Sequence, residues 1–282
     1  MKRKLFLISM LCLLTSIASF AQKKQTDLEM GGMKGKIKKI ERATYKAVDK
    51  MGQTEQGSLM SRQVSEFNEQ GMQVIATYYD SLNNLSSVTK SLYNEKNLCI
   101  EDNVYDSTNS LFSVTRRMYD DKDLLLNKIY YDAEGNLDSK VLYKYDKKGN
   151  LTEVTRYNSY GNVYEKTSIV YDKQGNETEY VERDGNGNLT DKWTATYDKK
   201  GNRTKKIVYD ENGKYSYHVE AKYDSNNNVV ETFAYEQDKE PVYQWNYQIV
   251  YDQQGNILKQ TEYRSEAKVP YSITIRNIEY YQ

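Results

Sequence analysis

Hydrophobic and polar positions alternate along most of this chain in short runs that recur at a regular spacing. In the segment 215–223 the odd positions hold Tyr, Tyr, Val, Ala and Tyr, and the even positions hold Ser, His, Glu and Lys. A period of two residues is typical of a β-strand with one face packed and the other in water. Such runs, of seven and nine residues in turn, recur between positions 67 and 263. The pattern therefore predicts a series of β-strands.

Five-residue loops separate the predicted strands, and each loop follows an anchor that is Tyr or Phe, or Arg at position 183, and that precedes Asp, Asn or once Glu. These anchors are spaced alternately by twelve and fourteen residues, from Phe67 to Tyr235. The fourth residue after each anchor from Phe67 to Tyr223, and after the later anchor Tyr251, is of a type that tolerates positive φ. These residues are Gly71, Asn83, Asn97, Asn109, Asp123, Gly135, Gly149, Gly161, Gly175, Gly187, Gly201, Gly213, Asn227 and Gly255. The Asp after the anchor is expected to close the turn by accepting backbone N–H groups two or three residues on.

Short loops join antiparallel neighbours, so the strands form a meander of hairpins. With a first hairpin (36–45 and 59–67) and a last strand (271–280), the chain has about eighteen strands. Because all strand lengths are odd, we expect the packed face to stay on one side throughout. The fold class is therefore all-β, a long antiparallel meander that forms a curved or coiled open sheet. Its first and last strands would be free edges, through which copies of the chain can associate.

The N-terminus has the layout of a secretory signal peptide. Lys2, Arg3 and Lys4 precede an apolar run, and small residues lead to Ala21. We predict a signal peptide over 1–21, a linker over 22–35 and one repeat domain over 36–282. A membrane-anchoring helix is the alternative, but the run is shorter than the ~20 residues that span a bilayer. The chain is thus expected to be exported to the periplasm, the cell surface or the medium, with no transmembrane segment after cleavage.

Composition restricts the partners. Cleavage removes three basic residues and no acidic one from 40 Lys+Arg and 40 Asp+Glu, which leaves a net charge of about −3. That balance does not favour nucleic acid or an anionic membrane surface as a partner. The chain has 28 Tyr against 5 Phe and 2 Trp, which suits half-exposed strands. Cleavage also removes Cys12, so Cys99 has no partner for an internal disulfide.

The segment 143–151, Tyr-Lys-Tyr-Asp-Lys-Lys-Gly-Asn-Leu, resembles the YD repeat of the Rhs (rearrangement hot spot) family. The resemblance covers residues 67–263 and implies a spiral of β-hairpin YD repeats. In large members the spiral wraps into a hollow shell, with functions in carbohydrate binding or toxin encapsulation. This chain has far fewer repeats, and it is more similar to the short exported YD-repeat proteins of Gram-negative bacteria, for which the family implies no specific activity.

Catalytic and metal sites find little support in the sequence. His218 is the only histidine, so a histidine triad and a multi-histidine metal site are excluded; we expect it on an exposed strand face. Cys99 lacks a neighbouring base and is expected to be a small buried hydrophobe. The turn aspartates are alternative calcium ligands, but calcium takes six to eight oxygens and each loop offers one carboxylate, so we predict that they close the turns. We predict no catalytic residue, no metal and no cofactor.

The remaining candidate is an aromatic face formed by Trp193, Tyr217, Tyr243, Trp245 and Tyr247. Such faces stack on sugar rings or contact proteins, although they also serve as the packed side of a sheet. We predict a non-enzymatic binding or structural module at the cell envelope, with a protein or glycan as partner. The alternative is a carbohydrate-binding or carbohydrate-active protein that uses this Tyr/Trp face.

Overall fold

The computed structural model describes residues 26–236, 240–264 and 269–282, so the predicted signal peptide lies outside the described residues. The prediction of an all-β chain is confirmed: one sheet holds eighteen strands, beside a single short helix, α1 (Asp27–Met30). The strands are β1 (Ile37–Lys50), β2 (Gln53–Phe67), β3 (Gln73–Tyr79), β4 (Leu85–Tyr93), β5 (Cys99–Asp106), β6 (Leu111–Tyr119), β7 (Leu125–Asp132), β8 (Leu137–Tyr145), β9 (Leu151–Asn158), β10 (Val163–Tyr171), β11 (Glu177–Asp184), β12 (Leu189–Tyr197), β13 (Arg203–Tyr209), β14 (Tyr215–Tyr223), β15 (Val229–Tyr235), β16 (Tyr243–Tyr251), β17 (Ile257–Arg264) and β18 (Val269–Tyr280).

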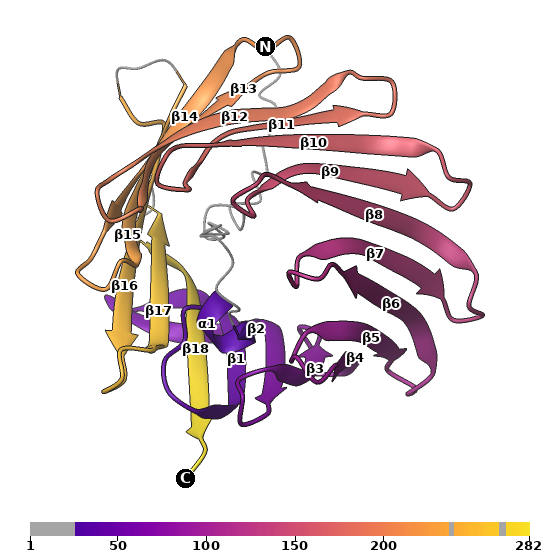
Figure 1. Ribbon diagram of the computed structural model, residues 1–282. Coiled ribbons are helices and arrows are strands. Elements are labelled where there is room, and N and C mark those ends of the chain that lie inside the picture. The colour runs from indigo at the N-terminus through magenta and orange to yellow at the C-terminus, as the bar shows by residue number, and fades with distance from the viewer. Residues whose placement is uncertain (1–25, 237–239, 265–268) are drawn as a thin grey trace.

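The sheet closes on itself. Each strand pairs antiparallel with the next along the chain, and β1 also pairs with β18, with Ala43 opposite Ile275 and Thr44 opposite Thr274. Figure 1 shows the strands forming a ring around a central space. The prediction of an open, curved or coiled sheet of YD-repeat hairpins is therefore wrong, because the protein is a closed barrel. Closure leaves no free edge among the described strands, which removes the predicted route to self-association through edge strands.

β-Bulges explain much of the curvature that brings the first and last strands together. After each repeat loop, the new strand carries one extra residue: Tyr119 pairs with Leu125, but Met118 pairs with Asn127. The same shift follows the next loop, where Tyr131 pairs with Leu137 and Tyr130 with Ser139. A bulge increases the local twist and bends the strand. Because the bulge recurs from loop to loop, the bends add up around the sheet.

The same bulges overturn the predicted facing of the shorter strands. Leu125 lies opposite Tyr119 on the inner face, but the extra residue Leu126 reverses the alternation that follows. Ile129 and Tyr131, predicted to share the inner face with Leu125, therefore lie on the outer face. Anchor tyrosines of the nine-residue strands face the lumen, whereas those of the intervening strands face outward. An odd strand length does not preserve the face when each turn adds a bulged residue.

The predicted turns are confirmed. All fourteen predicted positions have positive φ, for example 87° at Gly149 and 64° at Asp123. The Asp146 carboxylate closes its turn through Oδ1, which accepts the backbone N–H of Lys148 at 2.8 Å and of Asn150 at 2.9 Å. These donors lie two and four residues after Asp146, whereas the predicted separations are two or three residues. Turn closure is thus the role of this aspartate in the repeat.

The first hairpin is longer than predicted, because β1 and β2 continue to a two-residue turn at Met51 and Gly52, both with positive φ. On the inner side of this hairpin lies α1 (Figure 1). Leu28 of α1 is buried against Ile37 and Phe67, and its N–H donates to the carbonyl of Gly71 at 3.2 Å. The helix is therefore held against the wall at the start of the barrel. No helix in the described part of the chain is long and apolar enough to cross a membrane.

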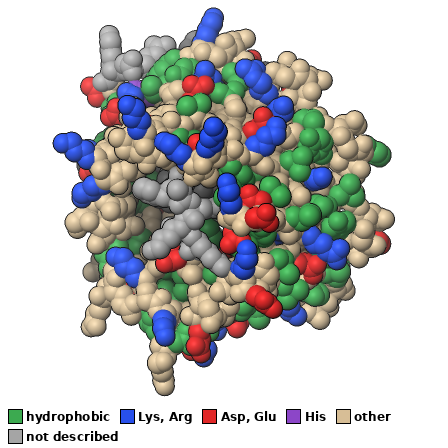
Figure 2. Space-filling view, in the orientation of Figure 1, with side chains coloured by type: hydrophobic (Ala, Val, Ile, Leu, Met, Phe, Trp, Pro, Cys, Tyr) green, Lys and Arg blue, Asp and Glu red, His purple; other side chains and the backbone are tan. Residues whose placement is uncertain are grey.

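Ion pairs join neighbouring strands on the outer wall, beside exposed apolar side chains such as Met118 and Val170. Arg116 pairs with Glu101 at 2.9 Å, and Lys144 pairs with Glu153 at 2.7 Å. Figure 2 shows acidic and basic side chains interspersed over the face in view. Exposed pairs of this kind add little stability, but they show that the outer wall is rich in charge.

Candidate functional site

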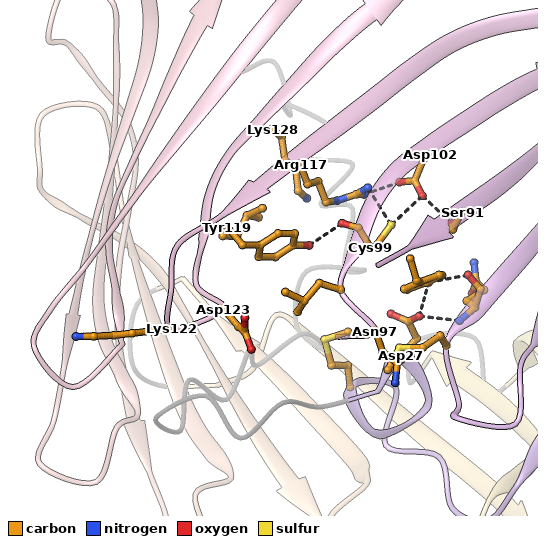
Figure 3. A pocket seen from close by; sticks show the side chains of 16 residues that line it. Asp27, Ser91, Asn97, Cys99, Asp102, Arg117, Tyr119, Lys122, Asp123 and Lys128 are labelled. Carbon is orange, nitrogen blue, oxygen red and sulfur yellow. Dashed lines mark hydrogen bonds and ion pairs between the residues drawn. The ribbon is translucent and has the colours of Figure 1, made fainter. Parts of the chain in front are cut away.

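The candidate site is a cavity of about 670 Å³ between α1 and the inner faces of β4 to β7. Asp27 and Met30 of α1 line one side, and Figure 3 shows Asp27 there. The wall opposite is polar and aromatic. It consists of Gln73, Ser91, Tyr93, Cys99, Asp102, Arg117, Tyr119, Leu125 and Lys128, with loop residues such as Asn97, Lys122 and Asp123 at one end.

Tyrosine hydroxyls form the base of this cavity. The Tyr119 hydroxyl donates to the carbonyl oxygen of Cys99 at 2.7 Å. The single proton of the Tyr93 hydroxyl is shared between the carbonyl oxygen of Gln73, at 2.7 Å, and Asp27 Oδ2, at 2.8 Å. The ladder between β5 and β6 ends with Glu101 opposite Arg116, so the Cys99 carbonyl lies beyond the last backbone pair. The tyrosine hydroxyl supplies the bond that the backbone does not make there.

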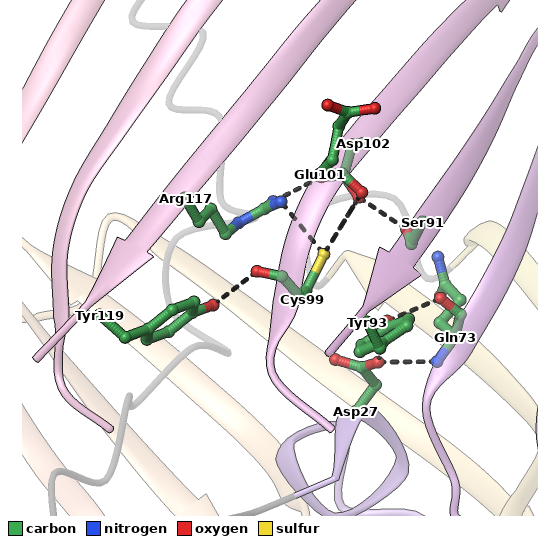
Figure 4. Close-up of polar contacts among 9 residues, drawn as sticks. All are labelled: Asp27, Gln73, Ser91, Tyr93, Cys99, Glu101, Asp102, Arg117 and Tyr119. Carbon is green, nitrogen blue, oxygen red and sulfur yellow. Dashed lines mark hydrogen bonds and ion pairs between the residues drawn. The ribbon is translucent and has the colours of Figure 1, made fainter. Parts of the chain in front are cut away.

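Asp27 fixes α1 against the same base. Its Oδ2 atom accepts the Gln73 backbone N–H at 2.7 Å and the Tyr93 hydroxyl at 2.8 Å (Figure 4). Burial raises the pKa of Tyr93, and the hydrogen bond to the negative Asp27 raises it further. This phenol therefore stays protonated and acts as a hydrogen-bond donor.

A charge cluster occupies the middle of the cavity wall. The Asp102 carboxylate accepts hydrogen bonds from the Arg117 guanidinium and, at 2.6 Å, from the Ser91 hydroxyl. Burial acts to raise the pKa of Asp102, but the hydrogen bonds from Arg117 and Ser91 outweigh it and leave the pKa below its usual value. Asp102 is thus an ionised partner of Arg117.

The Cys99 thiol belongs to the same cluster and is not activated. It donates to Asp102 Oδ1 at 3.4 Å and accepts from Arg117 Nη1 at 3.1 Å (Figure 4). Burial raises the pKa of Cys99 to about 12, despite the opposing effect of Arg117. Because the thiolate is the nucleophilic form, the geometry gives no support to a catalytic thiol.

Lys128 adds a second positive charge to the middle of this wall, beside Arg117. It lies opposite Arg117 on the neighbouring strand β7, and both side chains line the cavity (Figure 3). Among the described residues, no hydrogen bond or ion pair is found for its ammonium group, whereas Arg117 has Asp102. Burial lowers the pKa of Lys128, and the positive charge of Arg117 lowers it further. An anionic group placed in the cavity would offset both effects.

The five residues of the predicted aromatic face all lie on the inner wall, but not at this cavity. They come from β12, β14 and β16, on another part of the ring (Figure 1). Trp193 lies opposite Val208, which lies opposite Tyr217, so these two aromatic residues share one face. Trp193 stacks on Tyr180, with ring centroids 5.4 Å apart, and is only 6% exposed. It is therefore part of the packed wall.

The other three aromatic residues lie together on β16. Tyr243 and Trp245 are in contact, with ring centroids 5.6 Å apart, and Tyr243 is 50% exposed. Burial raises the pKa of Tyr247 to about 12. Tyr243 is thus the ring of this group with the most surface available to a ligand.

His218 is not the exposed strand residue that the pattern predicts. It is 4% exposed, because its ring stacks on Tyr235 at 4.6 Å. Its Nδ1 atom lies 2.9 Å from the Tyr215 hydroxyl. The histidine is a packed member of the outer wall, one position along β14 from the inward Tyr217.

Sequence reasoning missed Asp102, Arg117 and Lys128, although the repeat carries a signal for them. Each of the seven nine-residue strands has an equivalent position two residues before its inward anchor. The residues at this position are Ser91, Arg117, Tyr143, Ile169, Ala195, Ala221 and Ile249. Only Arg117 is charged in that row. The third residue after the start of the following strand is Asp102 in β5 and Lys128 in β7. The equivalent residues are Val154 in β9 and Tyr180 in β11. Finding these charges requires knowing that the bulge turns these positions inward.

No protein-family model and no curated protein matches the chain. Among solved structures, it is similar to a porin-like protein from Bacteroides uniformis ATCC 8492, at 12% identity over 86% of this chain and 98% of that one, with a TM-score of 0.47. A porin-like protein from Bacteroides vulgatus ATCC 8482 matches at 13% identity over 88% and 99%, with a TM-score of 0.35.

The Photorhabdus luminescens Tc holotoxin pore matches at 12% identity, with a TM-score of 0.32. The match covers 78% of this chain and 14% of that one. Likenesses this distant carry no argument about function. The resemblance to YD-repeat proteins stays a prediction from the sequence.

Proposed function

We propose that this chain is an exported, non-enzymatic binding protein of the cell envelope that holds a small polar ligand with an anionic group inside its barrel. The supporting observation is Lys128, which lines the 670 Å³ cavity beside Arg117 without a carboxylate of its own among the described residues. Cavities of this volume suit small molecules. Tyrosine rings and hydroxyls at the base would contact the rest of the ligand.

The charged side chains on the outer wall favour a barrel whose outer surface is in contact with water. A transmembrane barrel carries an outward apolar band about 25 Å tall on strands of roughly 9–11 residues. Here the repeat strands have seven to nine residues, and pairs such as Arg116–Glu101 and Lys144–Glu153 occupy their outward positions. The basic and apolar N-terminal segment supports export to the periplasm, the cell surface or the medium.

The chemistry of the cavity supports binding rather than catalysis. The Cys99 thiol stays protonated, since its pKa is raised to about 12. The carboxylate of Asp102 is occupied by Arg117 and Ser91. A general base needs a free proton-accepting atom and a pKa near the working pH. Neither Cys99 nor Asp102 meets both conditions.

Calorimetry with the mature chain, residues 22–282, tests the proposal. Glucuronate and gluconate serve as anionic probes and glucose as the neutral control. We expect the anionic probes to bind more tightly than glucose, and Lys128→Met to abolish the difference. Lys140→Met, on the outer face of β8, is the matched control and should bind as the wild type does. Equal binding of glucuronate by the wild type and Lys128→Met would reject the assignment.

A neutral glycan is the second candidate ligand, and the exposure of Tyr243 beside Trp245 favours it. Trp193→Phe leaves Trp245 as the single tryptophan, so its fluorescence reports on β16 alone. Quenching or a blue shift with cello- or malto-oligosaccharides supports this ligand class. Emission that is unchanged at millimolar sugar argues against it.

A further inference from the structure

A second cavity meets the first at Asp27 and Gln73, but its lining includes none of Asp102, Arg117 and Lys128. It has a volume of about 240 Å³ and lies between α1 and the inner faces of β1, β2 and β18. Leu28 and Phe67 form part of its apolar lining, while Arg42, Gln63, Ser65 and Arg276 are its polar groups from the three strands.

Two guanidinium groups face each other across this cavity wall. Arg42 and Arg276 are directly opposite in the pairing of β1 with β18, and Gln63 lies opposite Arg42 on β2. Arg42 Nη2 donates to Gln63 Oε1 at 3.1 Å. Side chains directly opposite one another are close neighbours, and like charges at such positions destabilise a sheet.

Neither arginine has an ion pair among the described residues, and Arg276 Nη1 is buried without an acceptor there. Other inward arginines differ: Arg117 pairs with Asp102, and Arg156 pairs with Glu165. A buried donor without an acceptor destabilises the folded state, and more so when it is charged. No ion pair among the described residues therefore neutralises the positive charges of Arg42 and Arg276.

Asp27, the acidic residue that lines this cavity, does not neutralise the two arginines. Asp27 also lines the cavity, but its Oδ2 accepts the Gln73 N–H and the Tyr93 hydroxyl at 2.7 and 2.8 Å. The pKa of Arg276 is lowered by burial and then by the charge of Arg42, the one neighbouring charge that acts on it appreciably. A guanidinium remains protonated under such shifts, so the positive charge persists.

We propose that Arg42 and Arg276 form a binding site for a small oxyanion, such as phosphate or sulfate, beneath α1. Guanidinium groups bind oxyanions through paired N–H donors, and Arg276 Nη1 offers an unused donor. The cavity admits an ion of this size with its waters but not an oligosaccharide. Because β1 and β18 are the strands that close the barrel, a bound anion would also stabilise the closure.

Thermal unfolding and calorimetry of the mature chain, with phosphate, sulfate or chloride at matched ionic strength, test this site. Phosphate and sulfate should raise Tm in a saturable way, and chloride should not. Arg276→Met should weaken anion binding by about 10- to 100-fold, as expected for charge-assisted hydrogen bonds. In chloride, its Tm should equal or exceed that of the wild type, because a buried unpaired charge is gone.

Three further variants make the result specific. Arg276→Lys keeps the charge but loses the planar fork, so it should fold and bind the anions more weakly than the wild type. Arg183→Met, at an exposed position of β11, should respond as the wild type does. Lys128→Met should also keep the full response, which separates this site from the cavity proposed above. Equal wild-type Tm values in phosphate, sulfate and chloride, or an undiminished response of both Arg276 variants, would overturn the proposal.

Discussion

The hydroxyl of Tyr119 donates a hydrogen bond to the carbonyl oxygen of Cys99, twenty residues earlier in the chain and 2.7 Å away. The same bond, from an inward anchor tyrosine to the residue that begins the preceding strand, recurs at the same separation around the barrel. The other pairs are Tyr93–Gln73, Tyr145–Leu125, Tyr171–Leu151, Tyr197–Glu177 and Tyr223–Arg203. The tyrosine of the repeat therefore joins neighbouring strands along one rim.

Removing one of these hydroxyls should destabilise the barrel. Tyr145→Phe loses the 3.0 Å bond to the Leu125 carbonyl, and we expect the free energy of unfolding to fall by about 1 kcal/mol. Tyr157→Phe is the control, because this outward anchor has no hydroxyl hydrogen bond among the described residues. Urea unfolding measures both variants. Equal losses for the two would show that the rim bonds contribute nothing.

Barrel closure predicts slow amide exchange in the first and last strands. In an open sheet, β1 and β18 would each have an unpaired side, and half of their amides would exchange quickly. Because the two strands pair with each other, peptides from 273–280 should be protected as well as those from β8. Hydrogen exchange followed by mass spectrometry measures this protection. Fast exchange confined to β1 and β18 would contradict closure.

The Asp102–Arg117 pair predicts a loss of stability in acid. The pKa of Asp102 in the folded protein lies below its usual value, and the unfolded value is about 3.9. The contribution of this group is therefore complete above the unfolded pKa and is lost as the pH falls through the lower, folded pKa.

Asp102→Asn removes this acid dependence and leaves Arg117 without its carboxylate, at a cost of about 2 kcal/mol near neutral pH. The difference in stability between the wild type and the variant should shrink below about pH 4. Asp121→Asn, in an exposed turn, is the control and should show no such trend. A difference that is constant from neutral pH to pH 2 would contradict the role of Asp102.

Cys99 should react slowly with thiol reagents in the folded protein. Its pKa is raised to about 12, so the reactive thiolate is scarce at pH 8. We expect alkylation by iodoacetamide to be at least about tenfold slower than in 8 M urea, where a thiol has its ordinary pKa of about 8.5. Mass spectrometry follows the modification. Equal rates in the folded and unfolded protein would show that the thiol is exposed and unperturbed.

The candidate site was only partly predictable. The aromatic positions Trp193, Tyr217 and Trp245 were correctly placed on one face by the alternation, but Trp193 proved to be buried against Tyr180. Asp102 and Lys128 were missed because the bulges at Ile100 and Leu126 turn them inward, against the alternation predicted for their strands. A bulge is a property of the backbone after a turn, and the alternation of residue types does not reveal it.

The sequence by itself determined the strands, their antiparallel order and the fourteen turns, because these depend on residues that are close together in the chain. Gly, Asn and Asp at the fourth loop position allow the positive φ, and the period of two residues makes the strands. Only the tertiary structure decided that the sheet closes and which side chains enter the lumen. Closure depends on pairing Ala43 with Ile275 and on curvature summed over many bulges, and both lie beyond the reach of any local pattern.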